Sequence, residues 1–134
     1  MKNMILAVDD EESIRESFSM ALEDSGYELV TASCVDEAIK LIGKKQPDLV
    51  FTDLKMPGKS GVVLVEHMQS KHPDIPIYVV TAFYEEFVEG LNELIAAGLS
   101  FNVMRKPVGL DQIRMVVDSV LGSVQTLPSP SKEK

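Results

Sequence analysis

Two short apolar segments of this sequence end abruptly in carboxylates. Residues 49–52 are followed by Asp53, and residues 4–8 are followed by Asp9 and Asp10. Both segments have the composition of strands that are buried on both faces of a parallel sheet. A carboxylate at the end of such a strand is costly to desolvate unless it has a partner or a function. Taken alone, each acid has a simpler interpretation: Asp53 as a loop cap, and the acidic pair as a helix entry favoured by the N-terminal dipole.

Two further apolar segments end near a hydroxyl and an ammonium group. Residues 76–81 end with Thr81, and residues 102–104 lie just before Lys106. In an open parallel sheet the carboxyl ends of the strands share one edge, where ligands bind. Thr81 could also serve as the N-cap of a following helix, and Lys106 could be an ordinary surface lysine. The coincidence with the three acids favours a common site.

Three carboxylates, a lysine and a threonine hydroxyl form a set with a definite chemistry. One pair of carboxylates about 4 Å apart costs about 4 kcal/mol at an effective dielectric constant near 20, so a cation is needed when all are ionised. Hard oxygen ligands in an incomplete protein cage suit Mg²⁺. Lys106 adds a positive charge and Thr81 a donor for an anion. The set predicts phosphoryl transfer onto Asp53, giving an aspartyl phosphate.

Helical periodicity fills the segments between the strands. Strands are predicted at 4–8, 28–32, 49–52, 76–81 and 102–104. Helices are predicted from Ile14 to a close at Gly26, from a Ser33–Asp36 capping box to before Pro47, and over 62–71, 85–97 and 110–121. Five strands alternating with five helices predict a flavodoxin-like, doubly wound α/β fold with a parallel sheet of order 2-1-3-4-5. That order makes the first and third strands neighbours.

Length and composition fit one domain. The chain has 134 residues, of which 45% are hydrophobic and 25% charged, and its net charge is −8. The negative charge argues against non-specific binding to nucleic acid or to an anionic membrane. No run reaches transmembrane length and no secretion signal is evident, so a cytoplasmic location is expected. Residues 1–123 are expected to form the domain, and the Pro- and Ser-containing residues 124–134 to form a flexible tail or the start of a linker.

Five separated motifs of the chain resemble the receiver domain of two-component response regulators. The resemblance extends from about residue 3 to residue 121, and residues 12–60 are similar to receivers of the nitrogen-regulatory type. The motifs are Asp9-Asp10, Asp53-Leu-Lys-Met-Pro57, Gly61, Thr81-Ala82 and Lys106-Pro107, in the family's order.

The resemblance implies a role for each matching residue. Asp53 would accept the phosphoryl group from a phosphohistidine of a sensor histidine kinase or a phosphotransfer protein. Lys106 would contact the phosphoryl oxygens, and Thr81 would move toward them. Mg²⁺ would be held by Asp53 and Asp10, with help from Asp9 and from the backbone carbonyl of Lys55. The protein would then be a signalling switch that slowly dephosphorylates itself, without turnover of an external substrate.

The sequence departs from the family at the expected output element. Receivers commonly carry an aromatic residue three positions before the lysine, where this chain has Val103, and Phe101 lies two residues earlier. We therefore expect phosphorylation to act through residues 83–103, changing a surface for an effector domain, a partner or self-association. Lys55 and Phe83 lie two positions after Asp53 and Thr81, where they are expected to restrict attack by water and so tune autodephosphorylation.

Two other functions have to be weighed. Phosphatases that work through an aspartyl phosphate typically need a second acid two residues after the nucleophile, and Lys55 stands there. A binding module that keeps the fold without phosphorylation would be expected to lack one of the acids or the lysine. All of them are present, which favours the phosphorylated switch.

Overall fold

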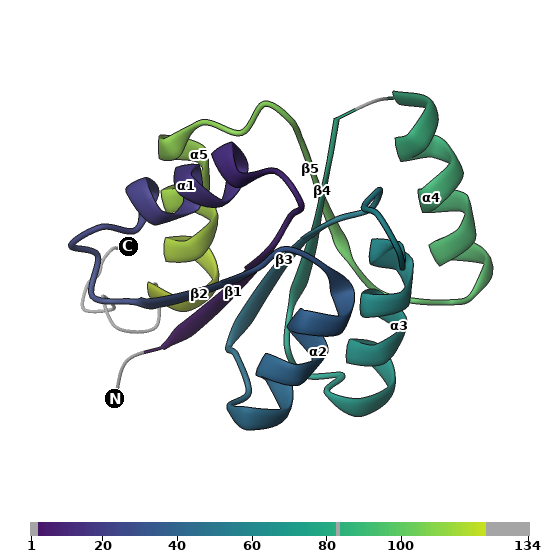
Figure 1. The fold of residues 1–134 in the computed structure, drawn as a ribbon, viewed down its shortest axis with the longest axis horizontal. Coiled ribbons are helices and arrows are strands. Elements are labelled where there is room, and N and C mark those ends of the chain that lie inside the picture. The colour runs from purple at the N-terminus through teal and green to yellow at the C-terminus, as the bar shows by residue number, and fades with distance from the viewer. Residues whose placement is uncertain (1–2, 83, 123–134) are drawn as a thin grey trace, which may run out of the picture.

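The computed structural model describes residues 3–82 and 84–122 and has one five-stranded sheet at its centre (Figure 1). Its strands are β1 (Met4–Val8), β2 (Glu28–Ala32), β3 (Leu49–Asp53), β4 (Ile77–Thr81) and β5 (Asn102–Arg105). All neighbouring strands are parallel, and the order is β2-β1-β3-β4-β5. The predicted flavodoxin-like topology is therefore confirmed.

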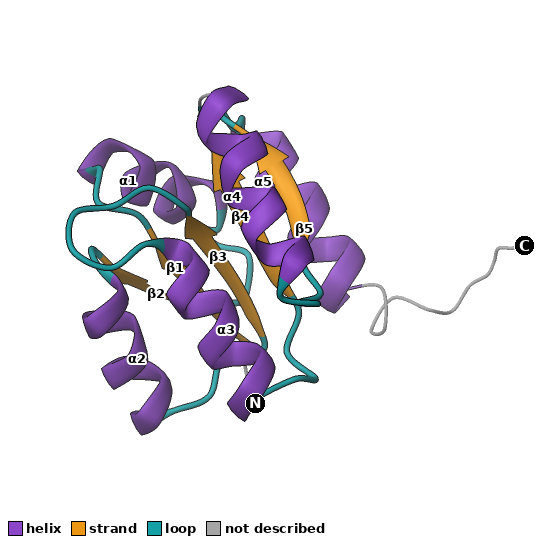
Figure 2. Cartoon of the chain, turned by 90° about the vertical axis from the view of Figure 1, so that its right-hand side faces the viewer, coloured by secondary structure: helices purple, strands orange, loops and turns teal. Residues whose placement is uncertain are grey.

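Helices cover both faces of the sheet (Figure 2). They are α1 (Glu12–Ala21), α2 (Val35–Lys44), α3 (Gly61–Lys71), α4 (Tyr84–Ala96) and α5 (Leu110–Val117), which continues into a π-helical turn (Asp118–Gly122). Buried residues of α1 and α5 share one core with the sheet, and those of α2, α3 and α4 share the other. This two-sided cover explains why the central strands are apolar at consecutive positions instead of alternating.

Consecutive side chains of the central strands point alternately into the two cores. Leu6 of β1 packs with the α2–α3 side, whereas its neighbour Ile5 packs with the α1–α5 side. On the second side the ring of Phe51 lies 4.9 Å from that of Phe18 and 5.6 Å from that of Tyr78, measured between centroids. The same packing that buries β1 and β3 brings Asp53, which ends β3, and Asp9, which follows β1, to one end of the sheet.

Apart from one-residue shifts in α3 and α4, two predicted helix ends and one predicted cap differ from the structure. Helix α1 ends at Ala21 and not at Gly26, because Asp24 and Gly26 both adopt positive φ angles, of 59° and 89°, in the turns that follow. Glu37, not the predicted Asp36, accepts hydrogen bonds from Ser33, at 2.7 Å from its amide nitrogen and 3.1 Å from its hydroxyl. The last helix keeps α-helical geometry only as far as residue 117.

None of the helices in residues 3–82 and 84–122 has the length and apolar character that crossing a bilayer requires. The predicted domain limit at residue 123 and the predicted tail over 124–134 lie outside the described residues, so both stay predictions.

Candidate functional site

The carboxyl ends of four strands meet at one end of the sheet. Asp53 is the last residue of β3 and pairs with Val80 of β4, and Thr81 pairs with Arg105 of β5. The register of β1 with β3 places the residue after Val8 beside Asp53. Carboxylate oxygens of Asp9, Asp10 and Asp53 accordingly all lie within 4.8 Å of one another. The structure thus places Asp53 beside two acids that lie 43 and 44 positions earlier in the sequence.

Lys106 joins two of these acids. Its Nζ lies 2.8 Å from Oδ2 of Asp9 and 3.3 Å from Oδ2 of Asp53, and its side chain is only 8% exposed. Glu11 is more distant, at 3.9 Å. The backbone N–H of Lys106 donates to the carbonyl of Thr81 at 2.9 Å, and the bond from Lys106 to Pro107 is cis. The lysine therefore faces the acids as their counter-ion, with Asp9 as its nearer partner.

Burial changes the ionisation of the central carboxylate. Loss of solvent raises the pKa of Asp53 to about 6; the neighbouring Asp9 charge adds to this rise and Lys106 opposes it. Burial would lower the pKa of Lys106, but its hydrogen bonds and charge interactions with Asp9 and Asp53 outweigh burial and raise that pKa. At pH 7 the site consequently combines an ionised Asp53 with a protonated lysine.

Asp9 and Asp10 are adjacent but differ in their surroundings. Asp9 is 3% exposed, and its N–H donates to the carbonyl of Ala32 at 3.1 Å. Its Oδ1 accepts from the N–H of Glu11 at 2.9 Å, and its carbonyl accepts from the guanidinium of Arg15 at 2.8 Å. Asp10 is exposed. Sequence reasoning missed Arg15, whose only signal was a cation in the first turns of the helix that follows the acids.

The three carboxylates fit a hard divalent cation. Mg²⁺ binds oxygen ligands at about 2.0–2.1 Å with octahedral geometry, so two ligands of one ion lie up to about 4 Å apart. The oxygens of Asp9, Asp10 and Asp53 need only small side-chain movements to reach that geometry from a mutual separation within 4.8 Å. Lys55 follows two residues after Asp53 in the loop and is exposed. The three carboxylates could therefore hold a metal ion, whereas the contribution of the Lys55 backbone carbonyl stays a prediction.

Gly61 closes the loop that follows Asp53. Its N–H donates to the carbonyl of Leu54 at 2.7 Å, and the helix that it begins is capped by Ser60, whose hydroxyl accepts from the N–H of Val62 at 3.1 Å. A Cβ atom at position 61 would overlap the carbonyl oxygen of Asp53. Glycine is therefore required here because the helix start packs directly on the backbone of the candidate phosphoacceptor, a reason that the motif alone did not reveal.

The aromatic residue near the lysine motif lies far from Thr81. Thr81 is 2% exposed and is paired with Arg105, whereas Phe101 precedes β5 and packs against the core on the α3 side. Phe101 lies four positions before Arg105, which is about 13 Å along an extended chain. Phe101 is thus not placed to respond to Thr81, and Val103 is aliphatic. Phe83 and the side chains of residues 84–87 lie outside what the structure describes.

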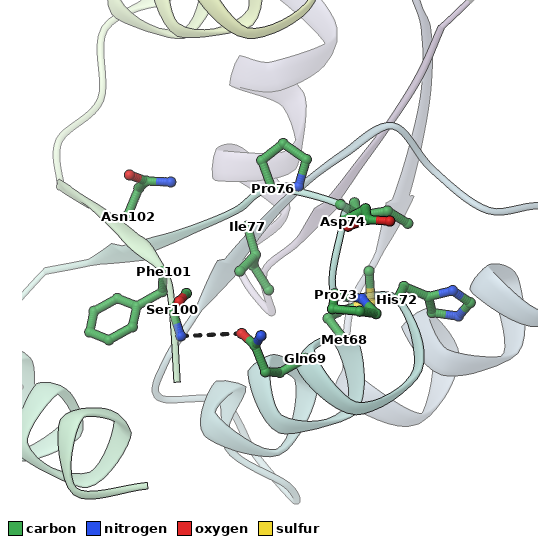
Figure 3. A pocket seen from close by; sticks show the side chains of 11 residues that line it. Met68, Gln69, His72, Pro73, Asp74, Pro76, Ile77, Ser100, Phe101 and Asn102 are labelled. Atoms are coloured by element: carbon green, nitrogen blue, oxygen red, sulfur yellow. Dashed lines mark hydrogen bonds between the residues drawn. The ribbon is translucent and has the colours of Figure 1, made fainter. Parts of the chain in front are cut away.

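A pocket of about 160 Å³ lies at the other end of the sheet (Figure 3). Its lining includes Met68, Ile77 and Phe101, and the amide oxygen of Gln69 accepts a hydrogen bond from the N–H of Ser100 at 3.2 Å beside it. The volume is below the 300–1,000 Å³ typical of small-molecule sites. The pocket lies at the amino ends of β4 and β5, whereas the acidic site lies at the carboxyl ends of the strands, so the two are separate.

Comparison with known proteins gives concordant matches. The family model described as "Response regulator receiver domain" matches residues 5–118. The alkaline phosphatase synthesis transcriptional regulatory protein PhoP of Bacillus subtilis is 33% identical over 133 residues, covering 99% of this chain and 54% of PhoP. This chain therefore spans about half the length of that relative.

Two solved structures extend the likeness to three dimensions. NtrX from Brucella abortus superposes with a TM-score of 0.78 at 29% identity, covering 93% of this chain and 28% of NtrX. The chemotaxis protein CheY4 of Vibrio cholerae gives a TM-score of 0.77 at 32% identity, covering 90% of this chain and all of CheY4. The likeness thus covers about a quarter of one of these chains and the whole of the other.

Proposed function

This chain belongs to the response regulator receiver domain family, and from that premise we propose that it is a phosphorylation-activated switch whose acceptor is Asp53. The family typically provides signalling switches, with a histidine kinase as the cognate partner. The observation that carries the proposal is the acidic cluster of Asp9, Asp10 and Asp53 within 4.8 Å, held by a buried Lys106. An ordinary loop cap would not need the other two acids or the lysine.

In the proposed reaction an oxygen of ionised Asp53 attacks the phosphorus of a phosphohistidine. The new bond is the P–O bond of an aspartyl phosphate, and the P–N bond of the donor breaks. The electron pair of the broken bond leaves with the imidazole nitrogen, which takes up a proton from water. When bound, Mg²⁺ supplies charge neutralisation for the carboxylates and the phosphoryl oxygens.

The protein's own contribution is charge and position. The transferred group adds negative charge beside Asp9, so a fixed cation is needed as the charge develops. Lys106 lies 3.3 Å from Asp53 Oδ2 and can follow the oxygens of the new phosphoryl group by giving up part of its contact with Asp9. Thr81 is the last residue of β4, the strand next to β3, and its hydroxyl can donate a hydrogen bond to the phosphoryl group.

We propose that phosphorylation of Asp53 is transmitted to other molecules by a change in residues 83–103. A displaced Thr81 would act first on the residues that follow it and on helix α4, which packs on the sheet through the fully buried Leu94. If this segment has two conformations, phosphorylation can shift the equilibrium between them only by the difference in the contacts that each makes with the phosphoryl group. The changed surface is proposed to bind an effector domain, a separate partner or a second copy of this chain.

A direct test is intact-mass measurement after incubation with phosphoramidate and Mg²⁺. Wild-type protein should gain one phosphoryl group, Asp53→Asn should gain none, and the exposed Asp74→Asn should behave as wild type. Omission of Mg²⁺ should slow the reaction strongly. Equal labelling of Asp53→Asn and wild type would show that another residue is the acceptor and would overturn the proposal.

A further inference from the structure

The guanidinium of Arg15 holds the peptide unit that joins Asp9 to Asp10. Its Nη1 donates to the carbonyl oxygen of Asp9 at 2.8 Å, in a partly buried contact. This oxygen belongs to the same planar peptide group as the nitrogen of Asp10. Rotation of that plane would therefore move the backbone from which the Asp10 carboxylate projects.

One other contact of Asp9 spans this peptide unit: the N–H of Glu11 donates to the Asp9 carboxylate, which is itself a candidate cation ligand. The N–H of Asp9 bonds to Ala32 of the neighbouring strand, and its carboxylate also bonds to Lys106. Lys106 would loosen its hold on Asp9 whenever Asp9 contributes to a cation site. The Arg15 contact comes from α1, outside the acidic cluster, and does not compete with a cation for a carboxylate oxygen.

We propose that Arg15 is a positioning residue for Mg²⁺, which orients Asp10 against Asp9 and Asp53 by holding the Asp9 carbonyl. The proposal rests on the proposed function, because it concerns the same acidic site. Groups that orient metal ligands from outside the ligand set commonly account for a factor of 10–100 in metal affinity. We expect the lower end of that range here, since the ligands are few and the ion keeps several waters.

The positive charge of Arg15 and its proposed positioning role predict opposite changes in Mg²⁺ affinity when Arg15 is replaced. A cation near the site repels Mg²⁺, so electrostatics alone predicts tighter binding after Arg15→Met. Loss of orientation predicts weaker binding in spite of the lost repulsion. A purely structural role in tethering α1 predicts lower stability with no change in Mg²⁺ affinity. The sign of the change therefore separates the three.

Arg114 provides a matched control. Its Nε donates to the carbonyl of Ala21 at 2.9 Å, so it makes the same type of contact at the opposite end of α1. Arg114→Met removes this guanidinium–carbonyl bond, an exposed contact with Asp111 at 3.2 Å and a positive charge, all at the end of α1 opposite to Asp9. Mg²⁺ dissociation constants of wild type and both variants are to be measured by titration of backbone amide resonances, with urea unfolding to confirm that each variant is folded.

The expected result is a dissociation constant raised about tenfold in Arg15→Met and unchanged in Arg114→Met. Arg15→Lys keeps a donor and should lie between wild type and Arg15→Met. With phosphoramidate, the Mg²⁺ concentration for half-maximal rate should rise in Arg15→Met, while the rate at saturating Mg²⁺ recovers. An unchanged or lowered dissociation constant in Arg15→Met would overturn the inference even if Asp53 is phosphorylated. If Mg²⁺ binding responds as expected but Asp53 is never phosphorylated, the proposed function fails and the positioning role stands.

Discussion

Replacing Asp53 by asparagine should stabilise the metal-free protein at neutral pH, although it removes the proposed phosphoacceptor. The pKa of Asp53 is about 6 in the folded chain, against 3.8 as its ordinary value, chiefly because the carboxyl is buried. At pH 7.5 the folded protein therefore holds an ionised group in a place that favours the neutral form. An amide of the same shape carries no such cost.

The magnitude follows from the shift. A rise of about two pH units corresponds to about 3 kcal/mol, and because the Asp53 side chain is only 8% exposed, solvent screening leaves about 2–3 kcal/mol. For an acid whose pKa is raised on folding, the stabilising contribution of the bound proton is complete below the unfolded value. It is lost as pH rises through the folded value. The advantage of Asp53→Asn should thus be absent near pH 3.8 and complete above about pH 6.

Urea unfolding followed by circular dichroism between pH 4 and 8, with a chelator present, measures this difference. Asp74→Asn makes the same chemical change on the surface and should leave the free energy of unfolding within about 0.5 kcal/mol of wild type. Added Mg²⁺ should reduce the difference, since it stabilises wild type in proportion to ln(1 + [Mg²⁺]/Kd) and the variant lacks one ligand. Equal stability of Asp53→Asn and wild type at pH 7.5, or an advantage that does not vary with pH, would refute the reasoning.

Four further results are expected. Asp10→Ala should abolish most of the Mg²⁺-dependent rise in melting temperature, and an unchanged rise would remove Asp10 from the site. Gly61→Ala should lower the free energy of unfolding, measured with urea, by more than about 2 kcal/mol, because the added Cβ would meet the Asp53 backbone; a variant as stable as wild type would contradict this. Beryllofluoride with Mg²⁺ should shift amide resonances over residues 84–103, and Thr81→Ala should suppress the distant shifts; identical spectra would exclude that route. Lys55→Ala should change the decay rate of phosphorylated Asp53, as measured by intact mass over time, without preventing phosphorylation; an unaltered rate would remove Lys55 from control of hydrolysis.

The identity of the fold could be read from local patterns. Apolar runs of strand length, alternating with helical periodicity, indicate parallel strands with crossover helices, and the rule of right-handed, short connections leaves few possible orders. Residues such as Asp53 and Thr81 could be assigned to one end of the sheet because every parallel strand terminates there. The end of α1 and the cap of α2 were less predictable, because positive φ angles and the choice between Asp36 and Glu37 depend on the local backbone.

The residue types of the site were thus determined by sequence, and the partners of each residue by tertiary structure. Which acid Lys106 approaches more closely depends on the register of β5 against β4 and on the loop after β1, neither of which has a periodic signal. The raised pKa of Asp53 depends on how completely the surrounding elements exclude water. The contact of Arg15 with the Asp9 carbonyl depends on the angle at which α1 leaves the sheet. Hydrophobic spacing encodes which face is buried, whereas distances of about 3 Å between residues far apart in sequence are set only when the whole chain packs.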